Sequence, residues 1–184
     1  MTSLLTSLAA AWWLIISYSS LTGSFHPNDA QQAVKDPDTT TIYLVRHAEK
    51  VTIDAANADP DLSPLGYQRA EALKARLASV PISAAFTTPY QRSRLTLAPL
   101  ARAKGIDLQP YKAHEYASLV KEILGHYRGK TVLVVGHSNT VLEIMEAFEL
   151  ERPVTSLSDQ DYDYLFQVRV PRKGKASVEV RHYH

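Results

Sequence analysis

The feature that most constrains the fold is an alternation of two hydrophobic periodicities along the chain. Short apolar runs, typical of buried strands, alternate with longer segments whose apolar residues recur every three or four positions, as in helices that face a core. We expect helices within 61–80, 89–104, 115–127 and 139–148, and strands at 42–45, 84–87, 107–111 and 131–135. This order predicts an α/β fold: a three-layer α/β/α sandwich around a mostly parallel central sheet.

The last part of the chain departs from this alternation. The runs "YLFQVRV" (164–170) and "ASVEVRH" (176–182) flank the turn-forming stretch "PRKGK". Two strand-like runs joined by a short glycine-containing turn indicate a β-hairpin. We therefore expect a C-terminal antiparallel hairpin to extend the parallel sheet.

Within 61–80 the helix start has a clear signature. Ser63 is expected to be the N-cap and Pro64 the first helical residue. The residues expected to face the core are Leu65, Ala72, Leu73 and Leu77.

Composition limits the classes of function. A chain of 184 residues with 45% hydrophobic residues can bury one core, so we expect one globular domain. The net charge of +1 and the absence of a block of like charge give no basis for binding nucleic acid or anionic lipid, so a small substrate is the expected partner. The absence of cysteine excludes disulfides, a thiol nucleophile, thiolate zinc sites and iron–sulfur clusters.

The N-terminus has a different character. Residues 1–28 contain no Lys, Arg, Asp or Glu, and an apolar run at 4–16 is followed by small residues. This pattern is typical of an export signal, which predicts a signal peptide at 1–23, a linker at 24–40, a domain at 41–184 and a periplasmic location. Because no Lys or Arg precedes the apolar run, an uncleaved membrane anchor is an alternative, and a cytoplasmic location is another.

Polar side chains follow three of the predicted strands. Arg46, His47 and Glu49 follow the first strand, Arg92 lies in the first turn of the helix after the second, and His137 follows the fourth. Ligands of open α/β sheets bind outside the carboxyl ends of the strands, so these side chains are expected to converge. Such a set suits a phosphoryl group, because arginines hold its oxygens and an imidazole can attack phosphorus.

The same residues carry a family resemblance. Four stretches resemble, in order, the motifs of the histidine phosphatase superfamily, also called phosphoglycerate mutase-like: "LVRHAEK", "LSPLGYQRA", "TTPYQRSRLT" and "VLVVGHSNT". The tail "DYDYLFQVRV" with its hairpin is similar to that of the small bacterial "RHAEK" branch. The resemblance implies that His47 is the phosphorylated nucleophile, that Arg46, Arg92 and His137 bind the phosphoryl group, and that the reaction needs no metal or cofactor.

The general acid is where the resemblance is least specific. Family members that have one place a Glu or Asp on the loop after the third strand, where this chain offers Glu115, with His114 next to it. Glu49 is a second candidate, and a chain with no acid would favour good leaving groups. Ser138 stands where the mutases have Gly, and Ala48 where the commonest first motif has Gly; both argue against a mutase. Glu49 and Ser138 are also candidate substrate-binding residues.

The expected function is a phosphatase that hydrolyses phosphomonoesters or phosphoramidates through a phosphohistidine on His47. Segment 51–61 is expected to line the pocket mouth, and it holds acidic residues but no Lys or Arg, which disfavours highly phosphorylated substrates. The relatives implied by the resemblance act on phosphohistidine proteins, sugar phosphates or many phosphomonoesters. Export would favour an envelope or nutritional phosphomonoester.

Two other functions are considered. A phosphate-binding or regulatory module would keep the arginines but would not depend on His47. A serine esterase would use Ser138 of "GHSNT", which approaches the nucleophile elbow GxSxG, followed by one of Asp159, Asp161 or Asp163 and then by His182. Thr140 replaces the final glycine of that motif, and the esterase leaves Arg46, His47 and Arg92 unexplained.

Some remaining residues receive structural interpretations. His182 and His184 are spaced to share one strand face and could ligate a metal, but a fraying C-terminus is the simpler interpretation. Tyr162, Tyr164 and Phe166 are expected to be core and rim aromatics.

Overall fold

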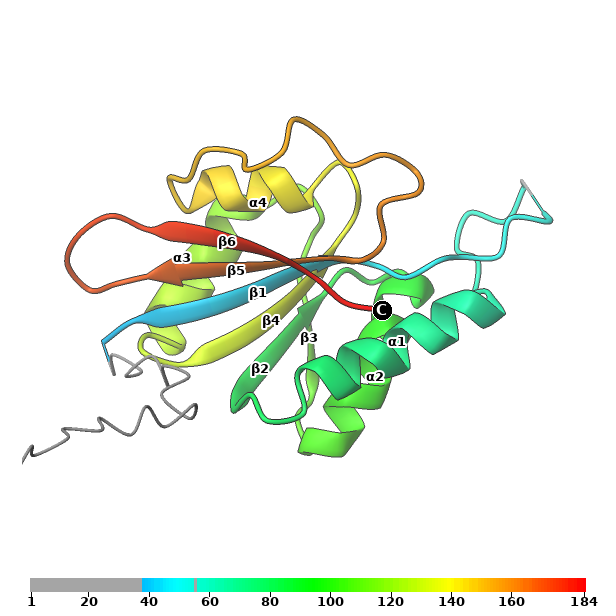
Figure 1. Ribbon diagram of the computed structural model, residues 1–184, viewed down its shortest axis with the longest axis horizontal. Coiled ribbons are helices and arrows are strands. Elements are labelled where there is room, and N and C mark those ends of the chain that lie inside the picture. Colours follow the sequence, from blue (N-terminus) through cyan, green and yellow to red (C-terminus); the bar gives the residue numbers. More distant parts are fainter. Residues whose placement is uncertain (1–37, 55) are drawn as a thin grey trace, which may run out of the picture. The chain divides into compact units, whose positions relative to one another are not determined.

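The computed structural model describes residues 38–54 and 56–184 (Figure 1). The predicted signal segment and all but the last residues of the predicted linker lie outside these ranges. Within the described part of the chain, no helix is both long enough and apolar enough to cross a bilayer. The described strands are β1 (Thr40–Arg46), β2 (Ile82–Thr87), β3 (Leu108–Pro110), β4 (Thr131–Gly136), β5 (Tyr164–Val170) and β6 (Ser177–His182), and the helices are α1 (Pro64–Arg76), α2 (Gln91–Lys104), α3 (Tyr116–His126) and α4 (Val141–Ala147).

The strands form one mixed sheet in the order β3-β2-β4-β1-β5-β6. The first four strands along this order are parallel, with Thr41 beside Thr131 and Arg46 beside Gly136 across the central β1–β4 pair. Strand β5 runs antiparallel to β1, and β6 runs antiparallel to β5. The predicted fold class, including the C-terminal antiparallel hairpin, is confirmed.

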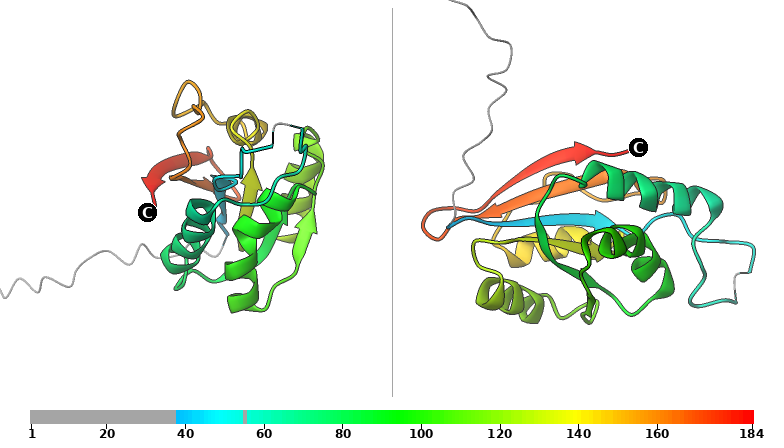
Figure 2. Two further views of the ribbon diagram at one scale, coloured as in Figure 1. Left: turned by 90° about the vertical axis from the view of Figure 1, so that its right-hand side faces the viewer. Right: turned by 90° about the horizontal axis from the view of Figure 1, so that it is seen from below.

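The side chains of the sheet point alternately into two hydrophobic cores, one on each face. Helices cover both faces, so the fold has three layers (Figure 2). Ile42 and Leu44 of β1 pack with residues of α3 and α4 on one face. Tyr43 and Val45 pack with residues of α1 and α2 on the other face. Because successive residues of a strand point to opposite faces, a strand buried on both faces is mostly apolar, as β4 is after Thr131.

Helix α1 begins as its sequence predicts. The Ser63 side chain accepts a hydrogen bond from the Gly66 backbone N–H at 3.1 Å, and Pro64 is the first helical residue. The prediction that Leu65 faces the core is wrong, because its side chain is 54% exposed. The buried stripe runs instead through Gly66, Ala70, Leu73 and Leu77, and Leu65 lies one position outside it.

Element ends differ from the expectations by a few residues. Strand β1 begins at Thr40, whose buried hydroxyl accepts a hydrogen bond from the Gly129 N–H, so the last residue of the expected linker belongs to the sheet. Helix α4 begins at Val141, two residues later than expected, because residues 137–140 form a turn in which the Thr140 N–H donates to the His137 carbonyl.

Candidate active site

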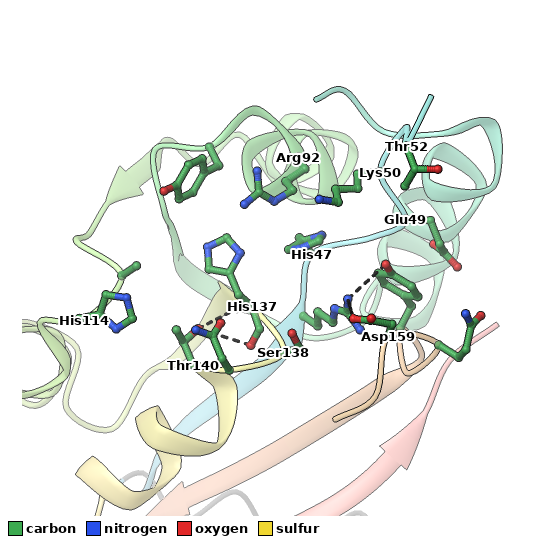
Figure 3. Close-up of a pocket in the computed structure, with 16 residues that line it drawn as sticks. His47, Glu49, Lys50, Thr52, Arg92, His114, His137, Ser138, Thr140 and Asp159 are labelled. Carbon is green, nitrogen blue, oxygen red and sulfur yellow. Dashed lines mark hydrogen bonds and ion pairs between the residues drawn. The ribbon is translucent and has the colours of Figure 1, made fainter. Parts of the chain in front are cut away.

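The carboxyl ends of β1 and β4 and the loop after β2 open onto one pocket of about 640 Å³ (Figure 3). Its lining includes most of the residues that the sequence singled out: Arg46, His47, Glu49, Arg92, His137 and Ser138. Thus a parallel sheet brings together side chains from three separate motifs, as its topology requires.

His47 lies at the centre of this set and is only 5% exposed. Its backbone N–H donates to the Gly136 carbonyl, and its ring Nδ1 lies 2.8 Å from the Ala48 carbonyl oxygen. Since a carbonyl only accepts, Nδ1 carries the proton and the neutral ring keeps a lone pair on Nε2. Burial lowers the pKa of His47 to about 3, against the opposing hydrogen bond to Ala48, and the nearby His137, Arg92 and Arg46 lower it further.

Arg46 is held from the far end of the chain. Its Nη1 donates to the Ser158 carbonyl at 2.6 Å, its Nη2 donates to the Tyr162 hydroxyl at 3.2 Å, and its guanidinium carbon lies 4.0 Å from the centre of the Tyr162 ring. The Asp159 carboxylate is 3.8 Å from Nη2. The buried Nε of Arg46 has no hydrogen-bond partner among the described residues.

Arg92 is still less satisfied. Its guanidinium lies 4.3 Å from the centre of the Tyr90 ring, and its buried Nε and Nη1 donate no hydrogen bond within the described chain. Asp59 forms an ion pair at 3.7 Å from Nη1, but its Oδ1 accepts a hydrogen bond from the Gln91 backbone N–H. Buried charged donors without acceptors are costly, so these N–H groups indicate a site for an anion.

His137 completes the set on the β4 side. Its Nε2 lies 3.0 Å from the Thr88 hydroxyl, which donates to Ser93, and its ring centre lies 5.2 Å from that of His47. Burial lowers the pKa of His137 to about 4, with further lowering by Arg92, Arg46 and His114. Both imidazoles are therefore neutral near pH 7 in the empty pocket.

The two further substrate-binding candidates differ in their availability. Glu49 lines the pocket, but Arg69 holds its carboxylate in an ion pair, with Nε at 2.8 Å and Nη2 at 2.7 Å. Ser138 also lines the pocket, and its hydroxyl has no hydrogen bond to a described histidine.

The arrangement does not support a serine esterase. His182, the expected partner of Ser138, does not line the pocket and lies 3.0 Å from the Asp163 carboxylate. His184 is 3.8 Å from the same carboxylate. Within residues 38–54 and 56–184, no three His, Asp or Glu side chains are grouped as metal ligands.

The structure does not bring Glu115 into this pocket, which corrects the expected position of the acid. Glu115 caps α3, its carboxylate lies 2.8 Å from Lys112 Nζ, and it faces a separate groove. Its neighbour His114 lines the pocket instead. The loop turns at these residues, where the Glu115 N–H donates to the Lys112 carbonyl, so the sequence located the loop but not the side chain that faces the site.

Several pocket residues were missed by the sequence interpretation. Tyr162, expected to be a core or rim aromatic, packs on Arg46, and Tyr90 packs on Arg92. Tyr90 lies in the same motif as Arg92 and could have been found there, whereas Tyr162 is 116 residues from Arg46. Of segment 51–61, expected to line the mouth, Thr52 lines the pocket; Lys50, just before it, adds a positive charge.

Comparison with known proteins supports the sequence motifs. The family model for the histidine phosphatase superfamily (branch 1) matches residues 42–115. No curated protein matches the chain.

Solved structures share the fold at low identity. The protein histidine phosphatase SixA complexed with tungstate has a TM-score of 0.62 and 13% identity, over 77% of this chain and 96% of that one. YhfR from Bacillus stearothermophilus has a TM-score of 0.62 and 21% identity, over 77% and 96%. A mycobacterial glucosyl-3-phosphoglycerate phosphatase has a TM-score of 0.64 and 12% identity, over 79% and 100%. The match over residues 42–115 and the shared fold make the chain similar to the histidine phosphatase superfamily.

Proposed function

We propose that this protein hydrolyses phosphomonoesters, or phosphoramidates, through a phosphohistidine on His47. One observation carries the proposal: a neutral imidazole with a free Nε2 lies among buried guanidinium groups, and the Nε of Arg46 and the Nε and Nη1 of Arg92 have no acceptor within the described residues. A phosphoryl group supplies the missing acceptors and places an electrophilic phosphorus beside the nucleophile.

In the first step, the lone pair on His47 Nε2 attacks phosphorus and the bond to the leaving-group oxygen or nitrogen breaks. Arg46, Arg92 and His137 hold the charge on the three other oxygens as the transition state forms. The Ala48 carbonyl accepts a hydrogen bond from Nδ1–H of His47, so the ring is oriented before the substrate arrives. In the second step, water attacks the phosphohistidine, and the electron pair of the broken P–N bond returns to Nε2.

The positive groups of the site perform the charge stabilisation that a metal ion provides in other phosphatases, so no step of this scheme is assigned to a metal. The expected partner is a small phosphorylated molecule. The periplasmic location is a further proposal, which rests on the sequence of residues 1–23 alone.

The first test is the hydrolysis of p-nitrophenyl phosphate in excess chelator by the full chain and by two variants. We expect the wild type and Ser138→Ala to be active and His47→Asn to lose nearly all turnover, because only His47 forms the covalent intermediate. Denaturation in alkaline detergent during turnover should trap a phosphoryl group on the wild type and on Ser138→Ala, and later acid treatment should release it.

Activity in His47→Asn, or its loss in Ser138→Ala, would contradict the proposal. A protein that binds inorganic phosphate through Arg92 but turns over no substrate, with or without His47, would instead be a phosphate-binding module.

A further inference from the structure

A row of three hydrogen-bonded side chains borders the pocket on the side of α3 and α4. His114 lines the pocket, and its Nδ1 lies 3.0 Å from the Tyr116 hydroxyl. That hydroxyl donates to the Glu143 carboxylate of α4 at 2.5 Å. The mechanism above uses none of these three groups.

The direction of the hydrogen bonds follows from chemistry. A carboxylate only accepts, so the single proton of the Tyr116 hydroxyl is given to Glu143, and the phenolic oxygen must accept from His114. Burial, together with Glu143, raises the pKa of Tyr116, so the phenol keeps its proton in the working range of pH. Nδ1 of His114 is therefore protonated, and Nε2 is the nitrogen left to meet a ligand.

The position of His114 fits a group that meets the leaving group. In Figure 3, His137 lies between His114 and His47, and the charge of His114 acts on His137. A leaving group departs opposite its attacking nucleophile, so it leaves away from His47. As seen from His47, His114 lies beyond His137 in this view, and its ring is exposed enough to meet groups of varied size.

The acidic side chains near the pocket interact with arginines or face another groove. Among the described lining residues the carboxylates are Glu49, held by Arg69, and Asp159, which is 3.8 Å from Arg46. Glu115 faces another groove. His114 is the lining residue that combines a proton on one ring nitrogen with a carboxylate behind it to stabilise its cationic form.

We propose that His114 is the general acid and base of the reaction, with Tyr116 and Glu143 as its positioning residues; this rests on the proposed function. In the first step the cationic His114 gives its Nε2 proton to the leaving-group atom, which keeps the electron pair of the broken bond to phosphorus. In the second step the neutral His114 takes a proton from the attacking water at Nε2, and the cationic form is restored.

The test compares two substrates that differ in their need for a proton. p-Nitrophenolate can leave without being protonated. The benzyl alkoxide released from benzyl phosphate is a poor leaving group, so it must be protonated as it leaves. We expect His114→Gln to lower kcat/KM for benzyl phosphate by roughly 10²–10⁴, the usual contribution of general acid catalysis, and to change that for p-nitrophenyl phosphate by a few-fold at most. Activity on p-nitrophenyl phosphate also shows that the variant is folded.

Two further variants serve as a control and as a test of Tyr116. Glu115→Gln changes the residue next to His114, which lies outside the pocket, so it should leave kcat/KM for both substrates unchanged. Tyr116→Phe keeps the ring but breaks the link to Glu143, so it should lower kcat/KM for benzyl phosphate more than that for p-nitrophenyl phosphate. His137 and Arg92 line the same pocket as His114, and Tyr116→Phe leaves both unchanged.

An equal loss on both substrates, or no loss on either, would overturn the role of His114. A wild type that cleaves p-nitrophenyl phosphate but not benzyl phosphate would do so too, because a working acid extends activity to poor leaving groups. These outcomes differ from failure of the proposed function, in which the wild type is inactive on both substrates or His47→Asn stays active.

Discussion

At the scale of single residues, the proposed mechanism depends on keeping His47 uncharged. A protonated imidazole has no lone pair with which to attack phosphorus, and a histidine in water is half protonated near pH 6.5. Burial and the neighbouring arginines shift this balance strongly, since the pKa of His47 is lowered to about 3. In the proposed mechanism, the arginines that would bind the phosphoryl group therefore also keep His47 uncharged.

This environment predicts an unusual pH dependence. For kcat/KM on p-nitrophenyl phosphate, corrected for ionisation of the substrate, we expect the acid limb of the free enzyme well below pH 6.5, near the pKa of about 3 for His47 and of about 4 for His137. The measurement is a profile from pH 3 to 8. A limb at 6.5 would show that His47 behaves as a solvent-exposed histidine.

The pH profile of Arg92→Gln, compared with that of the wild type, tests the contribution of the arginine. Removing this guanidinium takes away a positive charge that lowers the pKa of both His47 and His137. Turnover should fall by roughly 10²–10³, as for the loss of one oxyanion-hole donor, and the acid limb should move to higher pH. A limb that stays in place would show that burial alone sets the charge of the histidines.

At the scale of elements, the start of α1 holds the loop that follows β1. The Ser63 N–H donates to the Glu49 carbonyl at 2.8 Å, and α1 passes this carbonyl so closely that a Cβ at Gly66 would lie 2.1 Å from its oxygen. Glu49 follows His47 by two residues, and Arg69 of the same helix binds the Glu49 side chain. Helix α1 thus holds the loop that carries His47, and none of its residues lines the pocket.

Gly66→Ala tests this contact. We expect a loss of roughly 1–3 kcal/mol in the free energy of unfolding, because the new methyl group must displace backbone rather than a flexible side chain. Activity should fall as well, since the displaced loop carries His47. Urea denaturation and p-nitrophenyl phosphate turnover provide the two measurements.

Gly125→Ala is the control for this substitution. It lies in α3, and a Cβ there meets nothing within 4 Å. Alanine is favoured over glycine inside a helix by roughly 0.5–1 kcal/mol, so this variant should be slightly more stable than the wild type and fully active. If both variants were equally stable, the proposed close contact between α1 and Glu49 would be refuted.

At the scale of the whole molecule, the two buried histidines of the site make the stability of the fold depend on pH. His47 and His137 bind protons more weakly in the folded state than in the unfolded chain, because their pKa values are lowered to about 3 and about 4. As pH falls below 6.5, the unfolded chain takes up protons that the folded protein excludes. The contribution of neutral histidines is therefore fully present above pH 6.5 and is lost as pH falls toward 4.

We expect the free energy of unfolding to fall by roughly 1.4 kcal/mol per pH unit for each of the two histidines across this window. Urea titrations at pH 7.5, 5.5 and 4.5 would measure the slope, and His47→Asn should reduce it. A slope unchanged by His47→Asn would count against the buried neutral state of His47.

Inorganic phosphate should also stabilise the folded protein. At 100 times its dissociation constant it should add about 2.7 kcal/mol to the free energy of unfolding of the wild type, and less to that of Arg92→Gln at the same concentration.

Much of this protein could be inferred from local patterns. The periodicities predicted the parallel sheet, the hairpin and the cap at Ser63, because burial on both faces of a strand and helix capping depend on residues close together in the sequence. The motifs predicted that Arg46, His47, Arg92 and His137 would meet, because the carboxyl ends of parallel strands share one edge.

Other features were decided only by the tertiary structure. The hold of Ser158 and Tyr162 on Arg46 joins residues more than 110 positions apart, and no local pattern encodes such a contact. That His114 rather than Glu115 lines the pocket depends on how the loop turns between β3 and α3. The hydrogen bonds that join His114, Tyr116 and Glu143 require α3 and α4 to pack side by side. The sequence by itself determined the elements and the shared edge where the motifs meet, because both follow from short-range periodicity and strand direction. The direction of each side chain at that edge was set by packing between distant segments, which only the folded chain brings together.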